Sequence, residues 1–159
     1  VLVYKTPLLT SDLTLAGPII ADLMVAMTGT DADFVVKVID VYPENFDYQS
    51  NKNDYLMSGY QQLVRAEVMR GKYRNSFEKP EAFVANKPTS VKFTLPDVAH
   101  TFKKGHQLMI QIQSSWFPLV DRNPQQFLNI YEAKDSDFKK ATIRIYNNAS
   151  AIQLPVLAD

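Results

Sequence analysis

The sequence predicts an all-β fold, a jelly-roll β-sandwich built from antiparallel sheets. Seven or eight segments of the 159-residue chain alternate apolar and polar side chains with the period of two that is typical of strands. Polar loops of varied length join these segments, and none has the pattern of a helix that would connect parallel strands. Only residues 135–140 are compatible with a single helical turn. Antiparallel sheets packed face to face satisfy all of these observations.

The first two predicted strands are residues 13–27 and 34–42. The first has apolar or small residues at every odd position, and Gly17 with Pro18 predicts a bulge or a crossing between sheets. The second is apolar and β-branched at both parities, as expected for a central strand covered on both faces. Asp40 interrupts it. A buried carboxylate needs donors, so we expect Asp40 to accept hydrogen bonds from a neighbouring strand, from backbone or from an arginine.

The rest of the chain alternates polar loops with further strands. Residues 43–59 are polar and without period, which predicts a long excursion from the sheets. Alternation resumes in residues 61–73 and again in residues 91–95, where we expect Pro96 to end the strand. Two short strands are expected within residues 143–157.

Residues 106–124 are the most distinctive segment. Apolar side chains at alternate positions predict a strand that reaches from Leu108 to Trp116 with one buried face. Pro118 and Pro124 cannot donate to a ladder, so the chain must leave the sheet between them. We expect this turn to expose three polar residues, Asp121, Arg122 and Asn123. The segment therefore has the character of an edge that is presented to a partner.

The composition excludes several classes of function. The chain has no cysteine, which removes disulfides, thiolate metal sites and thiol nucleophiles. Its 17 Lys+Arg balance 17 Asp+Glu, so no overall field attracts nucleic acid or an anionic membrane. No apolar run approaches the roughly 20 residues of a membrane-spanning helix. The length predicts one domain, and the absence of an initiator methionine predicts a processed or excised piece of a longer chain.

Histidine and serine are the first candidates for chemistry. His100 and His106 lie in a lysine-rich link, where a general base or a pair of metal ligands is one interpretation. Their spacing matches no ligand pattern, so we expect exposed or capping histidines beside a turn. Ser114 and Ser115 lack the G-x-S-x-G turn that exposes a nucleophile. We expect them to be a structural pair in a strand.

Two charged groups raise the question of ligands. An acidic set offers oxygen ligands for calcium, but its spacing is not that of a calcium loop, and we expect turn caps or solvated charges instead. A basic patch beside an aromatic residue is a feature of nucleic-acid binding, but it is short and diluted by acidic neighbours. The acidic set is Asp31, Asp33, Asp40 and Glu44, and the basic patch is Arg65, Arg70, Lys72, Arg74 with Tyr73. We therefore predict no metal, no cofactor and no nucleic-acid partner.

Four aromatic residues lie close to predicted loops, namely Tyr73, Phe77, Trp116 and Phe117. Such rings stack on sugars, fill a core or anchor an interface. As a group they favour an interface, because interfaces are enriched in Trp, Tyr and Arg.

Five stretches of the sequence resemble the C-terminal domain of the X-Pro dipeptidyl-peptidase family, which includes cocaine esterase, α-amino-acid ester hydrolases and glutaryl-cephalosporin acylases. The resemblance covers essentially the whole chain in order. The motifs are VLVYKTPL at residues 1–8 with AGP at 16–18, DxDFxVKxxDVYP at 31–43, GxYRNSFEKP at 71–80, AHTFKKGH at 99–106 and SSWFPLVDRNP at 114–124.

The resemblance implies a jelly-roll sandwich of the galactose-binding-domain-like kind, attached to an α/β-hydrolase domain that lies upstream. The family's Ser-Asp-His triad belongs to that domain, so it implies no catalytic residue here, and neither His100 nor His106 corresponds to it. The parent protein would be a serine hydrolase acting on peptide, ester or amide bonds. The domain would pack on the hydrolase domain, help to wall the substrate cleft and contribute to contacts between copies of the chain. An extracytoplasmic location, periplasmic or secreted, is also expected.

We predict that the docking edge of this accessory domain consists of Tyr73, Arg74, Trp116, Phe117, Asp121, Arg122 and Asn123. The aromatic rings would supply apolar area, and the charged groups would fix orientation through hydrogen bonds. Two alternatives stay open. One is an independent carbohydrate-binding module, because fold does not decide function. The other is a complete small enzyme, against which the missing serine turn argues.

Overall fold

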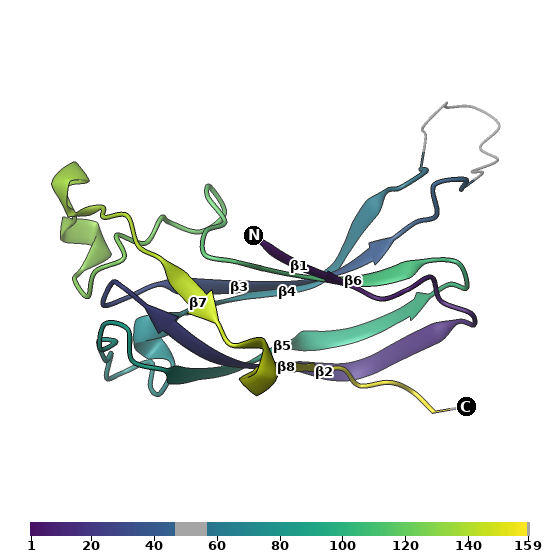
Figure 1. The fold of residues 1–159 in the computed structure, drawn as a ribbon, viewed down its shortest axis with the longest axis horizontal. Helices are drawn as coiled ribbons and strands as arrows, with labels where there is room; N and C mark the ends of the chain where they lie inside the picture. Colours follow the sequence, from purple (N-terminus) through teal and green to yellow (C-terminus); the bar gives the residue numbers. More distant parts are fainter. Residues whose placement is uncertain (47–56, 159) are drawn as a thin grey trace.

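Two antiparallel four-stranded sheets pack face to face in the computed structural model, which describes residues 1–46 and 57–158 (Figure 1). The predicted all-β sandwich is therefore confirmed. The first sheet has the order β1 (Leu2–Lys5), β6 (Gln107–Gln113), β3 (Asp33–Val41) and β4 (Gln61–Arg70). In the second sheet β5 (Thr89–Phe102) pairs with β2 (Leu13–Met27), and β2 pairs on its other side with β7 (Ile143–Ile145) and β8 (Ala151–Gln153).

The hydrophobic core lies between the two sheets and follows the two-residue period of the strands. Odd positions of β2 face even positions of β3, and both sets are almost fully buried. The core includes Leu15, Ile19, Leu23, Val25 and Met27 of β2, with Phe34, Val36 and Val38 of β3. The opposite face of β3 is also covered, as predicted for a central strand, and Val35 has no exposed surface. Burying each large side chain contributes about 1.5–3 kcal/mol.

The predicted irregularity in the first long strand is a bulge opposite Pro96. Gly17 pairs with Val98 and Ile19 with Leu95, so Pro96 and Asp97 together oppose the single residue between them. The expectation that Pro96 ends its strand is wrong, because a bulge tolerates a residue that cannot donate to the ladder, and β5 continues to Phe102.

The bulge has a consequence for side-chain direction. An extra residue in β5 moves the inward face from odd to even positions, so Val91, Phe93 and Leu95 are buried before it and Val98 and Phe102 after it. His100 shares this new inward parity and points between the sheets. A histidine expected in a turn thus lies on a strand.

Asp40 joins both histidines inside the sandwich. Its carboxylate lies 2.8 Å from Nε2 of His100 on the second sheet and 2.8 Å from Nδ1 of His106 at the start of β6. The ring of His106 lies 4.6 Å from the ring of Tyr42 and is buried. The prediction of exposed or capping histidines is wrong, and the predicted donors to Asp40 are replaced by imidazole N–H groups. Asp40 thereby ties the two sheets together.

Several element boundaries also differ from the prediction. The first strand, β1, lies at a sheet edge with all four residues exposed, so its sequence shows no buried face. β6 ends at Gln113, which leaves Ser114 and Ser115 exposed outside the strand where a structural pair was predicted. β4 gives way to a 3-10 turn at Gly71–Tyr73, and a 3-10 turn at Asp135–Asp137 confirms the predicted helical turn. Most of the predicted excursion, residues 47–56, lies outside the described residues.

Gly71 is required where β4 ends. A Cβ atom there would lie 2.6 Å from the ring of Phe83 and 2.7 Å from the carbonyl oxygen of Ala32. The amide of Gly71 donates to that same carbonyl at 2.8 Å. The close approach brings the turn after β4 against the turn before β3, where the site described below is built.

Replacing Asp40 by alanine tests the tie between the sheets. We expect Asp40→Ala to lower the free energy of unfolding by about 2–4 kcal/mol, because the imidazole N–H groups of buried His106 and partly buried His100 lose their acceptor. Asp97→Ala is the control, because it removes an exposed carboxylate from β5, the strand that carries His100. It should change stability by less than about 0.5 kcal/mol. Urea unfolding of both variants measures the difference, and equal stabilities would contradict the role of Asp40.

Asp12 provides a pH-dependent contact between the β1–β2 link and the β5–β6 turn. The side chain of Lys103 and the backbone N–H of Lys104 both donate to it at 2.8 Å, and these bonds lower the pKa of Asp12 below its usual value. A lowered folded pKa stabilises the fold above the unfolded pKa, about 3.8, and this stabilisation is lost as pH falls through the folded value.

Asp12→Asn should therefore lower stability at pH 6 and have a smaller effect at pH 2.5. The comparison requires urea midpoints of wild type and variant at both values. Asp22→Asn, which removes the exposed partner of Lys92 at 3.5 Å, is the matched control. An effect of Asp12→Asn that does not change with pH would contradict the linkage.

Candidate docking surface

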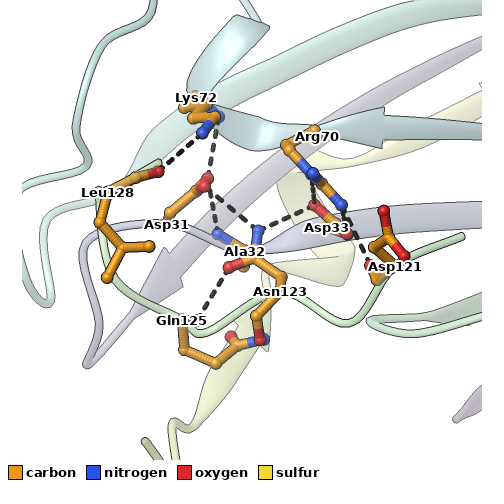
Figure 2. Close-up of polar contacts among 9 residues, drawn as sticks. All are labelled: Asp31, Ala32, Asp33, Arg70, Lys72, Asp121, Asn123, Gln125 and Leu128. Atoms are coloured by element: carbon orange, nitrogen blue, oxygen red, sulfur yellow. Dashed lines mark hydrogen bonds and ion pairs between the residues drawn. The ribbon is translucent and has the colours of Figure 1, made fainter. Parts of the chain in front are cut away.

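A buried polar cluster lies where β3 begins (Figure 2). Asp33 is 2% exposed and sits directly opposite Arg70 of β4, whose Nε and Nη2 donate to its two oxygens at 3.1 and 3.2 Å. Asp31, also 2% exposed, accepts the backbone N–H groups of Ala32 at 2.9 Å and Lys72 at 3.0 Å. The prediction of solvated charges is wrong for this pair, because both carboxylates are buried and N–H donors surround their oxygens.

Asn123 connects this cluster to the loop after β6. Its side-chain amide donates to Asp31 at 3.2 Å and to Asp33 at 2.9 Å, while its own oxygen accepts the N–H of Gln125 at 2.8 Å. Asn123 is 7% exposed, so the expectation that the turn exposes it is wrong. The reason is that the buried carboxylates of Asp31 and Asp33 need hydrogen-bond donors, and the side-chain amide of Asn123 donates to each of them.

Two further bonds hold the same loop. Nη2 of Arg70 also donates to the carbonyl oxygen of Asp121 at 3.0 Å, and Nζ of Lys72 donates to the carbonyl oxygen of Leu128 at 2.9 Å. The loop after β6 has no ladder partner at these positions, yet Figure 2 shows it bonded at residues 121, 123 and 128 to the ends of β3 and β4. Backbone that would otherwise move is thereby ordered.

Burial and hydrogen bonding shape the electrostatics of the cluster. Burial raises the pKa of Asp31, although the bonds from Asn123 and Ala32 act in the opposite direction. The guanidinium of Arg70 loses hydration, but its bonds to Asp33 and the negative charges around it raise its pKa overall. Arg70 therefore stays charged and compensates Asp33.

The anchored loop presents apolar side chains to solvent. Phe117 is 63% exposed, Leu119 68% and Tyr131 87%. Two hollows of about 260 and 460 Å³ adjoin them and share Asp121 and Tyr131 in their walls. We call the surface formed by Tyr73, Phe117, Leu119, Asp121, Arg122 and Tyr131 the docking surface.

Four of the seven predicted contact residues border the docking surface, and the other three are partly or largely buried. Tyr73, Phe117, Asp121 and Arg122 border the hollows of the docking surface. Trp116 is half-buried beneath the loop, with Nζ of Lys37 4.1 Å from its ring centroid. Arg74 and Asn123 face the interior instead. Whether each residue touches a partner stays a prediction.

Arg74 supports the turn rather than the outer surface. Its guanidinium donates to the carbonyl oxygens of Gly71, Glu81 and Ala82 and lies 4.1 Å from the ring of Phe83. The other members of the predicted basic patch are bonded in the same way, since Arg65 donates to the carbonyl oxygen of Asp97. These cations are bonded to acceptors within the domain.

Sequence reasoning missed Leu119, Tyr131 and Lys72. Leu119 lies between the two prolines that were used to predict the turn, and an apolar residue in such a turn was a usable signal. Tyr131 is separated from Phe117 by an irregular stretch of the chain, and no local sequence pattern links the two residues. Lys72 was assigned to a basic patch, whereas it is 7% exposed.

Neither a metal site nor a catalytic constellation is present in the described part of the chain. Residues 1–46 and 57–158 contain no group of three His, Asp or Glu side chains that could hold a metal ion. Both histidines bond to Asp40, and within these ranges neither bonds to a serine. In the same residues, no helix has the length and apolar character needed to cross a bilayer.

A third hollow, of about 420 Å³ and mostly apolar, opens between the sheets on another side of the sandwich. Leu23, Ile110, Ile112 and Ile145 are among the residues in its walls, and the hydroxyl of Tyr4 donates to Asn147 at 2.7 Å beside it. None of the predicted contact residues lines it.

Asn123→Asp tests whether the bonds from Asn123 to Asp31 and Asp33 hold the loop after β6. The substitution replaces the side-chain amide by a carboxylate of nearly the same size. It replaces the amide donor by a third carboxylate beside two buried ones, so we expect a loss of about 3 kcal/mol or more at pH 7. Crowded carboxylates have raised folded pKa values, so the loss should shrink as pH falls toward 4.5.

Asn129→Asp is the matched control for this test. The oxygen of Asn129 accepts the N–H of Tyr131 at the start of a 3-10 turn, and an aspartate retains that bond. Urea unfolding of both variants at the two pH values decides the outcome. Equal losses at positions 123 and 129 would remove Asn123 from the anchor.

Comparison with known proteins finds similarity to part of several hydrolases. It is 28% identical to cocaine esterase from Rhodococcus sp. (strain MB1 Bresler) over 99% of the chain. Solved structures of an α-amino acid ester hydrolase (43% identity, 98% of the chain, TM-score 0.90) and of an aminopeptidase from a marine sediment Thaumarchaeota archaeon (40%, 99%, 0.89) have the same fold. A hydrolase from Staphylococcus aureus, at 15% identity and TM-score 0.64, shares the fold alone.

The chain spans only part of these relatives, namely 25% of cocaine esterase, 25% of the ester hydrolase and 26% of the aminopeptidase. Residues 1–151 match the family model described as the X-Pro dipeptidyl-peptidase C-terminal non-catalytic domain. The chain belongs to the family of X-Pro dipeptidyl-peptidase C-terminal non-catalytic domains.

Proposed function

We propose that this domain follows an α/β-hydrolase domain in a serine hydrolase and packs against it through the docking surface. The relatives bear the names of an esterase, an ester hydrolase and an aminopeptidase, and each is about four times as long as this chain. The parent protein would accordingly cleave ester, amide or peptide bonds. This domain would supply no catalytic group and would help to wall the substrate cleft.

The observation that carries the proposal is a patch of exposed apolar residues on rigid backbone. Large exposed apolar patches on soluble domains mark interaction sites. Phe117, Leu119 and Tyr131 are each more than half exposed, and the loop beneath them is held by the buried carboxylates of Asp31 and Asp33. A surface ordered before binding loses less entropy on association, which favours a stable contact between domains.

The position of Val1 supports the same partner. Val1 and Leu2 line a hollow of about 190 Å³ together with Gln113 and Ser114, the residues from which the anchored loop departs. Figure 1 shows the N-terminus and this loop on the same side of the sandwich. A domain that precedes Val1 would therefore start within reach of the docking surface.

The double variant Phe117→Ser/Tyr131→Ser tests the proposal in the full-length protein. Each ring contributes about 1.5–3 kcal/mol when buried, so we expect the β-sandwich to unfold at lower temperature and separately from the hydrolase domain. Both rings are exposed in the 159-residue chain, whose own stability should change little. Calorimetry of full-length protein and of the chain alone gives the comparison.

Leu8→Ser is the matched control, since Leu8 is 61% exposed at the opposite end of the molecule, near the β5–β6 turn. Full-length protein that unfolds identically with and without the double change would count against the docking surface. Retention of the chain on a polysaccharide, lost in the double variant, would identify a carbohydrate-binding module instead.

A further inference from the structure

Arg122 is an exposed cation whose donors are not used within the domain. Among residues 1–46 and 57–158, its guanidinium makes no hydrogen bond and no ion pair. This sets it apart from Arg70 and Arg74, which each bond to several acceptors. A guanidinium carries five N–H donors in a planar fork, so Arg122 presents an unused binding group at the middle of the docking surface.

Two aromatic rings hold this guanidinium in place. Its central carbon lies 5.0 Å from the ring centroid of Phe138 and 5.9 Å from that of Phe117, distances at which a cation is attracted to the face of a ring. The rings come from segments on either side of the loop. They limit the side chain to few orientations while they leave its N–H edge free.

The backbone of Arg122 is fixed from both sides by the buried cluster. The carbonyl oxygen of Asp121 accepts a bond from Arg70, and the amide of Asn123 donates to Asp31 and Asp33 (Figure 2). Both chain neighbours of Arg122 are therefore bonded to the ends of β3 and β4. The cluster thus holds Arg122 outward as a preorganised group.

The nearest carboxylate in the sequence does not neutralise Arg122. Asp121 forms no ion pair with it, and the negative charge of Asp121 instead contributes to stabilising charged Arg70. The hollow beside Arg122 measures about 260 Å³, and Ile130, Tyr131 and Phe138 line it together with Asp121. The apolar part of these walls lowers the local dielectric and strengthens an ion pair formed at Arg122.

We propose that Arg122 receives the side-chain carboxylate of an aspartate or glutamate on the hydrolase domain, with both guanidinium edges donating to it. This inference rests on the proposed function, because it names the chemistry of the partner surface at the same docking site. A carboxylate fits the planar fork in a bidentate way, which a point charge does not reproduce. The surrounding rings of Phe117, Tyr131 and Phe138 would exclude water from the pair.

Zero-length cross-linking of full-length protein identifies the partner group. In the Arg122→Lys variant a carbodiimide joins the introduced amine to a carboxylate only when the two are in contact. Peptide mapping should find position 122 linked to an Asp or Glu that precedes Val1. A link confined to Asp121 or to another residue of this domain, or no link at position 122, would overturn the proposal.

Hydrogen exchange of full-length wild type and variants gives an independent measure. We expect Arg122→Gln to accelerate exchange in residues 117–138 about tenfold, which corresponds to one charged hydrogen-bonded contact. Arg122→Lys should accelerate it less than Arg122→Gln, because a lysine keeps one charged contact with the carboxylate but loses the bidentate fork and the stacking on two rings. Lys104→Gln, which removes one exposed charge at the opposite end of the sandwich, is the control and should have no effect on this segment.

The outcomes separate the two proposals. If residues 117–138 are protected in full-length wild type and Arg122→Gln leaves that protection unchanged, the docking surface stands and the carboxylate partner of Arg122 is excluded. If the segment exchanges as fast in full-length wild type as exposed loops do, the docking surface itself is wrong. Protection that is lost with Arg122→Gln and retained with Lys104→Gln supports both.

Discussion

Two buried carboxylates that cannot stay unpaired organise the functional end of this domain. Removing a charge from water costs several kcal/mol unless hydrogen bonds and an opposite charge replace the lost hydration. Asp31 and Asp33 meet this requirement with donors from β4, from the turn after it and from Asn123 in the loop after β6. Satisfying the two carboxylates thereby orders a segment that has no strand pairing of its own.

The strand β3 begins at Asp33 and carries another buried carboxylate near its other end. Asp33 lies at the start of β3 and Asp40 near its end, and each accepts donors from segments that are remote in sequence. Between them every residue except Lys37 is apolar and buried. β3 thus acts as the central strand of the hydrophobic core and as the element to which loops at both ends of the sandwich are bonded. At one end the bonds join the two sheets, and at the other they support the docking surface.

Residues of the same type have two different roles at this end of the domain. Some bond within the domain and hold the loop after β6, and others are exposed on the surface of that loop. Arg70 and Arg122 are both arginines, yet Arg70 compensates the buried charge of Asp33 and Arg122 has no acceptor among the described residues. The difference arises from depth, because a group under the loop must bond within the domain, whereas a group on top of it meets solvent or a partner. An unused cation among exposed aromatic rings has the composition common at protein interfaces, which is the basis of the contact proposed above.

The sequence by itself determined the fold class, the long bulged strand, the central strand and the turn between Pro118 and Pro124, because these depend on local alternation and on the missing N–H of proline. Its motifs also indicated the family. Tertiary structure alone decided that β5 passes Pro96, that His100 and His106 share Asp40, and that Asn123 turns inward. Those outcomes depend on which donors and acceptors meet across 60 to 92 residues of chain, and no local pattern records that distance.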